Sequence, residues 1–113
     1  LKAEIESFNQ SLKKNLTFSG AMDNLMQTAV LFQNAPNPFN ENTLIQYEIP
    51  ENASNAALNV YDLQGKQIVS YQLEQLGKSE IKIPGSSFNP GMYLYSLIVD
   101  NKTIDTKQMV ITE

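Results

Sequence analysis

From residue 29 onwards, hydrophobic and polar positions alternate along short segments that are separated by Pro, Gly, Asn or Asp. In residues 43–49, for example, Ile45, Tyr47 and Ile49 share one face of an extended chain. This alternation predicts seven strands, over residues 29–33, 43–49, 56–61, 67–73, 80–84, 92–99 and 103–112. Short strands with turn signals about every 8–12 residues favour an all-β fold, a seven-stranded antiparallel immunoglobulin-like β-sandwich.

Turn signals support this division into strands. Glycine accepts the positive φ that many turns require. Gly65 therefore favours a hairpin turn over residues 62–66, and Gly77 favours a turn over residues 74–78. Asp100 and Asn101 predict a tight hairpin, since Asn tolerates the left-handed region. Residues 92–99 are hydrophobic on both faces, which is typical of a central strand that is covered on both sides.

The first 28 residues follow a different pattern. Leu1, Ile5, Phe8 and Leu12 are spaced to lie on one stripe of a helix, which predicts an amphipathic helix over residues 1–18. The spacing fits either the end of a coiled coil or a helix packed on a neighbour. Residues 19–28 are interpreted as a linker, and residues 29–113 as the β domain. Because the chain opens without an initiator Met or a signal peptide, we expect it to be the C-terminal part of a longer protein.

Composition narrows the chemistry that this chain can support. The 113 residues carry 8 Lys+Arg and 12 Asp+Glu, a net charge of −4, and contain no His and no Cys. Disulfides, Cys/His zinc sites, thiol nucleophiles and His-based triads are therefore excluded. All the basic residues are Lys, and the acidic balance makes a nucleic acid an unfavourable partner. We expect no catalytic residue, no cofactor, no metal site and no small-molecule substrate.

Two motifs resemble catalytic signatures but lack the required context. Gly77, Lys78 and Ser79 match the end of a phosphate-binding loop, yet no helix is predicted after them. Ser79 and Lys82 have the spacing of a serine–lysine pair, but three residues apart on a strand they point to opposite faces. A structural reading is favoured for both motifs.

The order of four short motifs is more specific than any single one. An Asn-Pro-Phe turn at residues 37–39 is followed by a Tyr-Asp-x-x-Gly-Lys hairpin at residues 61–66. A Gly-x-Tyr strand begins at Gly91, and a Lys-x-Met-Val-Ile strand lies near the end of the chain, at residues 107–111. Together they resemble the type A C-terminal sorting domain of the bacterial type IX secretion system, over about residues 30–113.

The resemblance implies a secretion address with no enzymatic activity of its own. The passenger is expected to reach the periplasm, to cross the outer membrane through the type IX machinery, and to be secreted or held at the cell surface. The expected partners are the outer-membrane shuttle and translocon proteins and the sortase that usually removes the domain. A coiled coil in residues 1–18 would belong to the passenger and would make it an oligomer.

The resemblance also implies which residues matter for recognition. They belong to two turns and to the last strand, where an edge strand is expected to expose unpaired backbone groups to a partner. These residues are Gly65, Lys66, Gly91, Tyr93, Lys107, Met109, Val110 and Ile111.

Two further segments receive an assignment. A structural turn is expected at Pro36, Asn37, Pro38 and Phe39, since proline fixes φ and Phe39 can plug one end of the sandwich. Cleavage is expected in the linker, around Ser19, Gly20 and Ala21. The competing interpretation is a permanent immunoglobulin-like adhesion or carbohydrate-binding module of a surface fibre. A hydrolase would need a pair of carboxylates that the fold brings together.

Overall fold

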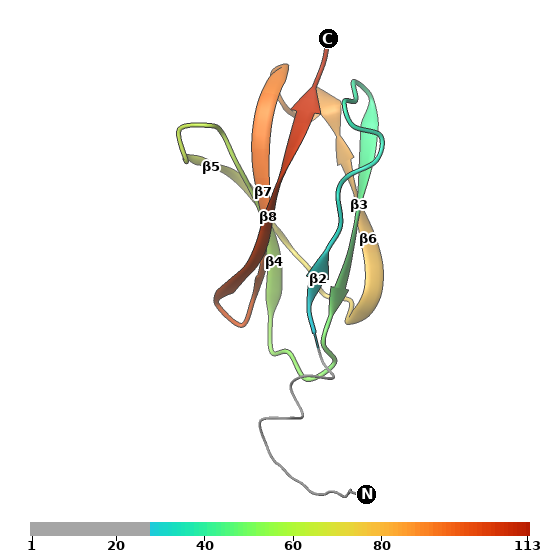
Figure 1. Ribbon diagram of the computed structural model, residues 1–113, viewed down its shortest axis with the longest axis vertical. Coiled ribbons are helices and arrows are strands. Elements are labelled where there is room, and N and C mark those ends of the chain that lie inside the picture. Colours follow the sequence, from blue (N-terminus) through green and yellow to red (C-terminus); the bar gives the residue numbers. More distant parts are fainter. Residues whose placement is uncertain (1–27) are drawn as a thin grey trace, which may run out of the picture.

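The computed structural model describes residues 28–113 of the chain. Seven strands form two antiparallel sheets that pack face to face (Figure 1). One sheet has the order β2-β3-β6, with β2 at Val30–Leu31, β3 at Asn42–Ile49 and β6 at Gly77–Pro84. The other has the order β5-β4-β7-β8, with β4 at Ala56–Tyr61, β5 at Gln67–Gln72, β7 at Gly91–Val99 and β8 at Lys102–Ile111. The predicted all-β class and the seven antiparallel strands are confirmed.

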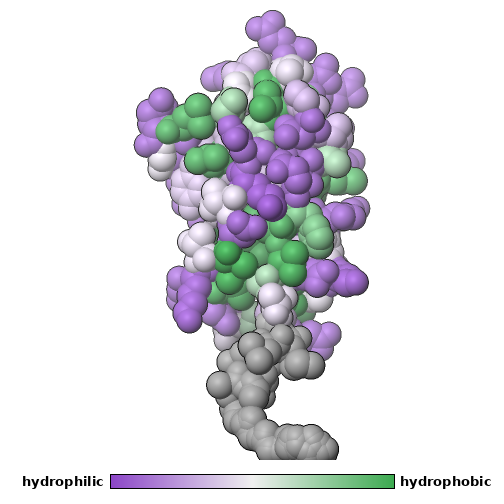
Figure 2. All heavy atoms as spheres, in the orientation of Figure 1, coloured by the Kyte–Doolittle hydropathy of each residue, from purple (hydrophilic) through white to green (hydrophobic). Residues whose placement is uncertain are grey.

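The core between the sheets is made by the alternating hydrophobic positions. Ile45 of β3, Leu58 of β4 and Met109 of β8 are fully buried, each on the inward face of its strand. Each such side chain contributes about 1.5–3 kcal/mol through its removal from water. Hydrophobic side chains also reach the surface over the hairpin of β5 and in the lower half of the edge between the sheets (Figure 2).

The turn between β7 and β8 has the predicted conformation. Asp100 and Asn101 have φ values of 50° and 68°, as a two-residue hairpin turn requires. The Asp100 carboxylate also accepts hydrogen bonds from the backbone N–H groups of Ser54 and Asn55, at 2.8 and 3.0 Å. This turn is therefore tied to the loop that precedes β4.

Two predicted strands differ in length from those observed. The first strand is only Val30–Leu31, because the chain after it keeps only isolated backbone hydrogen bonds to β3, at Phe32 and Ala35, while Gln33 and Phe39 bond to β8. The fifth begins at Gly77 rather than at residue 80. Gly77 has a φ of 77° and already pairs with Ile49, so the turn before it is shorter than predicted. The first residues of β6 were not predicted as a strand, because the Lys and Glu side chains that alternate there face solvent and give no hydrophobic signal.

The prediction that both faces of residues 92–99 are covered is wrong. Strand β7 is central within its sheet, as predicted. On its outer face, however, Met92 is 41% exposed and Leu94 and Ile98 are only half-buried. Nothing in the part of the chain that the structure describes covers this face.

The predicted helix over residues 1–18 and the linker up to residue 27 lie outside the described residues, as do Ser19, Gly20 and Ala21. Among residues 28–113, no helix has the length and apolar character needed to cross a bilayer.

Candidate functional site

Most of the candidate recognition residues meet at one end of the sandwich, here called the C-terminal end. The pairing of Tyr61 with Leu94 and of Gly91 with Ile111 brings the β4–β5 turn, the start of β7 and the end of β8 to this end. Thr28 lies at the opposite end, close to Pro50 and Gly77, and the β7–β8 turn is at that end too (Figure 1). A chain segment that precedes Thr28 therefore enters the domain far from the candidate residues.

The turn between β4 and β5 exposes Gly65 and Lys66 at the C-terminal end. The Asp62 carboxylate accepts hydrogen bonds from the backbone N–H groups of Gln64 and Lys66, both at 2.9 Å. Gly65 has a φ of 88°, and a Cβ there would meet nothing within 4 Å. The positive φ therefore explains why residue 65 is a glycine. The Lys66 side chain is exposed and makes no structural contact among the described residues.

Gly91 and Tyr93 at the start of β7 differ in accessibility. Gly91 is exposed and has a φ of 153°, which L-residues rarely adopt. Tyr93 is buried, with its hydroxyl donating to the carbonyl of Asn89 at 2.7 Å and its ring centroid 5.3 Å from that of Phe88. Tyr93 therefore closes the β6–β7 loop from inside, and a partner would meet Gly91 rather than the Tyr93 ring.

The last strand offers few side chains to a partner. Met109 and Ile111 are buried in the core, and Val110 is half-buried on the outer face. Lys107 lies partly exposed at the margin of the sandwich, with its Nζ 3.4 Å from the Asp105 carboxylate. An exposed pair of this kind contributes less than about 1 kcal/mol.

The outer edge of β8 is occupied in its second half by residues 33–39, here called the cover segment. Gln33 donates through Nε2 to the carbonyl of Gln108 at 2.7 Å, and the Val110 N–H donates to the Asn37 side chain at 2.9 Å. Phe39 N–H donates to the Val110 carbonyl at 3.0 Å, and Thr112 N–H donates to the Phe39 carbonyl at 2.8 Å. The expectation that the end of the last strand exposes unpaired backbone groups is therefore wrong.

The proline turn lies within this cover segment. The peptide bonds before Pro36 and Pro38 are both cis. Phe39 is 4% exposed and bridges to Ile111, so its side chain belongs to the core at the C-terminal end. The turn thus places a hydrophobic side chain in the core and makes three hydrogen bonds with residues 110 and 112.

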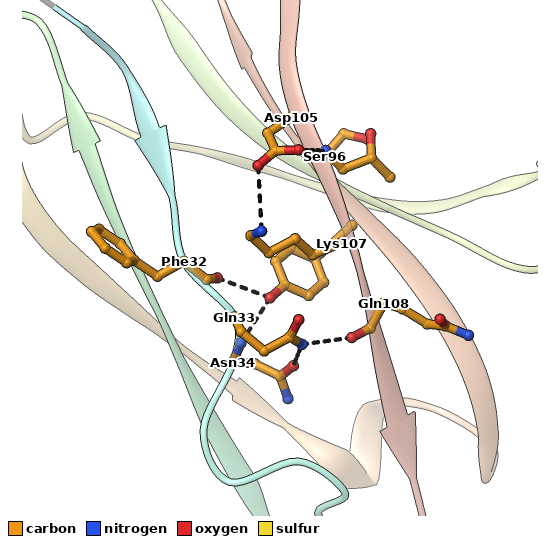
Figure 3. A network of polar contacts seen from close by, with 9 residues as sticks. Phe32, Gln33, Asn34, Ser96, Asp105, Lys107 and Gln108 are labelled. Atoms are coloured by element: carbon orange, nitrogen blue, oxygen red, sulfur yellow. Dashed lines mark hydrogen bonds and ion pairs between the residues drawn. The ribbon is translucent and has the colours of Figure 1, made fainter.

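A buried polar network that the sequence did not indicate holds the cover segment to the core (Figure 3). The fully buried Tyr95 of β7 accepts a hydrogen bond from the Asn34 N–H at 2.8 Å and donates to the Phe32 carbonyl at 3.0 Å. The Asn34 side chain donates to Thr43 Oγ1 at 3.0 Å, and Thr43 donates to the Pro36 carbonyl at 2.8 Å. Both sheets and the cover segment therefore share one set of hydrogen bonds.

Alkaline pH is expected to weaken the fold through Tyr95. Burial raises the pKa of its hydroxyl from 10.0 to about 12, the nearby Asp105 adds to the rise, and the hydrogen bond from Asn34 lowers it. The folded protein keeps this proton between pH 10 and 12 whereas the unfolded chain loses it. The stabilisation is therefore complete below pH 10 and falls by about 2 kcal/mol by pH 12.

Urea unfolding at several pH values between 9 and 12 measures this loss. The control is Tyr95→Phe, which leaves two buried partners unpaired and should cost about 1–3 kcal/mol at neutral pH. In that variant the fall in the free energy of unfolding above pH 10 should be shallower than in the wild type. Burial also raises the pKa of Tyr71, so a smaller fall of the same sign remains. Equal slopes in the two proteins would contradict the assignment.

Metal-ligating side chains are not clustered on the remaining surface of residues 28–113. No group of three or more His, Cys, Asp or Glu side chains in residues 28–113 could hold a metal ion. A shallow hollow on the outer face of the β2-β3-β6 sheet is bordered by Phe32, Gln46, Glu48, Lys78 and Glu80. It lies on the opposite sheet from most of the candidate recognition residues.

Comparison with known proteins agrees with the order of motifs along the chain. The family model described as the secretion system C-terminal sorting domain matches residues 35–112. The match covers the four residues of the proline turn and all eight candidate recognition residues. No curated protein matches the chain. The matched region is more than half of the chain, and it establishes that this chain belongs to the family of type IX secretion C-terminal sorting domains, which direct export across the outer membrane to the cell surface or the medium.

Proposed function

We propose that this domain directs its passenger through the type IX system by binding the outer-membrane shuttle, translocon and sortase proteins transiently at the C-terminal end of the sandwich. The observation that carries the proposal is the position of the accessible candidate residues. Gly65, Lys66 and Gly91 lie at the end remote from Thr28. A passenger attached before Thr28 would leave that end free for a partner.

The eight candidate residues divide into two roles under this proposal. Gly65, Lys66, Gly91 and Val110 present backbone or side-chain surface to the partner. Tyr93, Met109 and Ile111 are buried and act by holding the turn and the last strand in place. Lys107 contributes through the margin of the sandwich, where its ion pair with Asp105 leaves it partly exposed.

The course of export follows from the same proposal. The passenger passes through the periplasm, and the sortase cuts before the sandwich, in the linker that contains Ser19, Gly20 and Ala21. The end of a coiled coil in residues 1–18 would belong to an oligomeric passenger. The sandwich is immunoglobulin-like in its arrangement of two antiparallel sheets, and it serves as a signal with no catalytic role.

An export assay tests the proposal against the alternative of a permanent adhesion module. The full chain is fused behind a signal peptide and a fluorescent protein in a host with the type IX machinery, and in the same host without its translocon. We expect the reporter outside the first host, with the domain removed, and in the periplasm of the second. A reporter that stays in the periplasm of both hosts would overturn the proposal, and so would a domain that remains attached outside the cell.

A further inference from the structure

The outer face of the β5-β4-β7-β8 sheet carries no charged side chain among the residues that point outward along its four strands. At the C-terminal end this face is hydrophobic, with Tyr61, Ile68, Met92, Leu94 and Val110. Ile68 is 43% exposed and Met92 is 41% exposed. Figure 2 shows hydrophobic side chains reaching the surface on the β5 side, towards the C-terminal end.

The other sheet shows what a solvated face of this protein looks like. On the outer face of β3 and β6, Glu48 pairs with Lys78, Gln46 with Glu80 and Leu44 with Lys82. Charge alternates along this face, as on sheets that face water. Depletion of charge combined with exposed apolar and aromatic side chains is instead typical of the centre of a protein–protein interface.

Several polar side chains on the uncharged face are already paired with one another. Ser96 Oγ lies 2.7 Å from Thr106 Oγ1, and Ser70 donates to the Asn59 side chain at 2.6 Å. Asn59 in turn donates to the Tyr61 hydroxyl at 3.2 Å. A partner that excludes water from this part of the face would therefore leave these five side chains with their hydrogen bonds, which lowers the cost of desolvation there.

The size of the face indicates what kind of complex it can form. Four strands about 4.8 Å apart and about eight residues long cover roughly 500 Å². A stable interface takes about 800 Å² from each partner, and smaller ones belong to transient encounters. A permanent dimer of this chain through the face is thus disfavoured, whereas a brief contact during export fits. The face also continues to Gly91 through the neighbouring Met92 and Val110.

We propose that this uncharged face is a docking surface for a protein of the export machinery, whose complementary surface is apolar and uncharged. This inference rests on the proposed function and adds to it the surface by which the machinery holds the domain. Residues of β4, β5 and β7 that lie at the C-terminal end of the sandwich then take part in recognition alongside the exposed turn residues.

Two matched variants test the docking surface in the full-length fusion. Met92→Glu places a carboxylate on the uncharged face, and Leu44→Glu places one on the charged face of the other sheet. The two positions are 41% and 38% exposed, so both variants should fold like the wild type, as circular dichroism would verify. We expect Met92→Glu to lower export about tenfold or more, because the interface would bury an unpaired charge, and Leu44→Glu to leave it unchanged.

The other outcomes separate the two proposals. If the wild-type fusion is not exported, the proposed function itself fails. If it is exported and the two variants match it, the function stands and the docking surface is overturned. Sedimentation that shows a dimer of the wild type, absent in Met92→Glu, would assign the face to a second copy instead.

A separate experiment tests whether another segment of the same chain packs on the uncharged face. The protein has no Cys, so Met92→Cys and Leu44→Cys each introduce a single thiol for labelling with a maleimide in the full chain. Similar labelling rates are expected, since the face is open before docking. Strong protection of Met92→Cys alone would overturn the proposal in favour of a segment of this chain.

Discussion

A chain that ends at Thr106 is expected to be unfolded at 25 °C and neutral pH. The deletion removes Met109 and Ile111 from the core, and the loss of each such side chain costs about 2–5 kcal/mol. It also removes the partners of Tyr93 and Tyr95 in β7 and the hydrogen bonds that β8 makes with the cover segment. Domains of this size have a total stability of about 5–15 kcal/mol.

Far-UV circular dichroism and thermal unfolding of the truncated chain check this expectation. The full-length chain should unfold cooperatively, and the truncated chain should show no transition. A cooperative transition within a few degrees of the full-length value would contradict it. If the truncated chain is unfolded, its failure in an export assay says nothing about recognition, because an adhesion module and a sorting signal would both be lost with the fold.

At Met109, a role in the stability of the core can be distinguished from a direct contact with a partner. Met109→Ala should lower the free energy of unfolding by about 2–5 kcal/mol, because the side chain is fully buried and its removal leaves a cavity. Met109→Leu conserves the volume and should cost less than about 1.5 kcal/mol. We expect Met109→Leu to be exported like the wild type, since a partner cannot reach this side chain in the folded domain.

Urea unfolding and the export assay measure the two effects in parallel. Lys102→Ala is the control, because its exposed side chain lies at the other end of the same strand. Export that is lost in Met109→Leu while the variant remains as stable as the wild type would show that the machinery reads Met109 itself. That result would also imply that β8 leaves the core during recognition.

Local pattern predicted those parts of the fold that depend on neighbouring residues. Alternation located all seven strands, and burial of Ile45, Tyr47 and Ile49 on one face of β3 is as predicted. The hairpin at Asp100 and Asn101 was predicted because two adjacent residues suffice to favour it. The order of motifs predicted the family, since four matches in the correct sequence are far more specific than one.

Contacts between distant segments were not predictable in the same way. Asn34 and Tyr95 are 61 residues apart, and no local pattern shows that their hydrogen bond forms. The cover segment illustrates the consequence, because the sequence predicts β8 as an edge but cannot show that residues 33–39 return to pair with it. The hydrophobic residues on the outer face of β7 likewise predicted a covered face, but exposure of that face depends on which other elements pack against it.

If the machinery binds the C-terminal end of the domain, a matched pair of lysines at the two ends should respond differently to substitution. Lys66 is exposed in the β4–β5 turn at that end, and Lys102 is exposed beside the β7–β8 turn at the opposite end. Lys66→Glu and Lys102→Glu change the net charge equally, and within residues 28–113 neither side chain has an ion pair or a core contact to lose. Export of the full-length fusion is measured for both variants after verification of their fold. We expect Lys66→Glu to lower export several-fold and Lys102→Glu to leave it unchanged, whereas equal export, or a loss confined to Lys102→Glu, would show that the machinery does not bind this end.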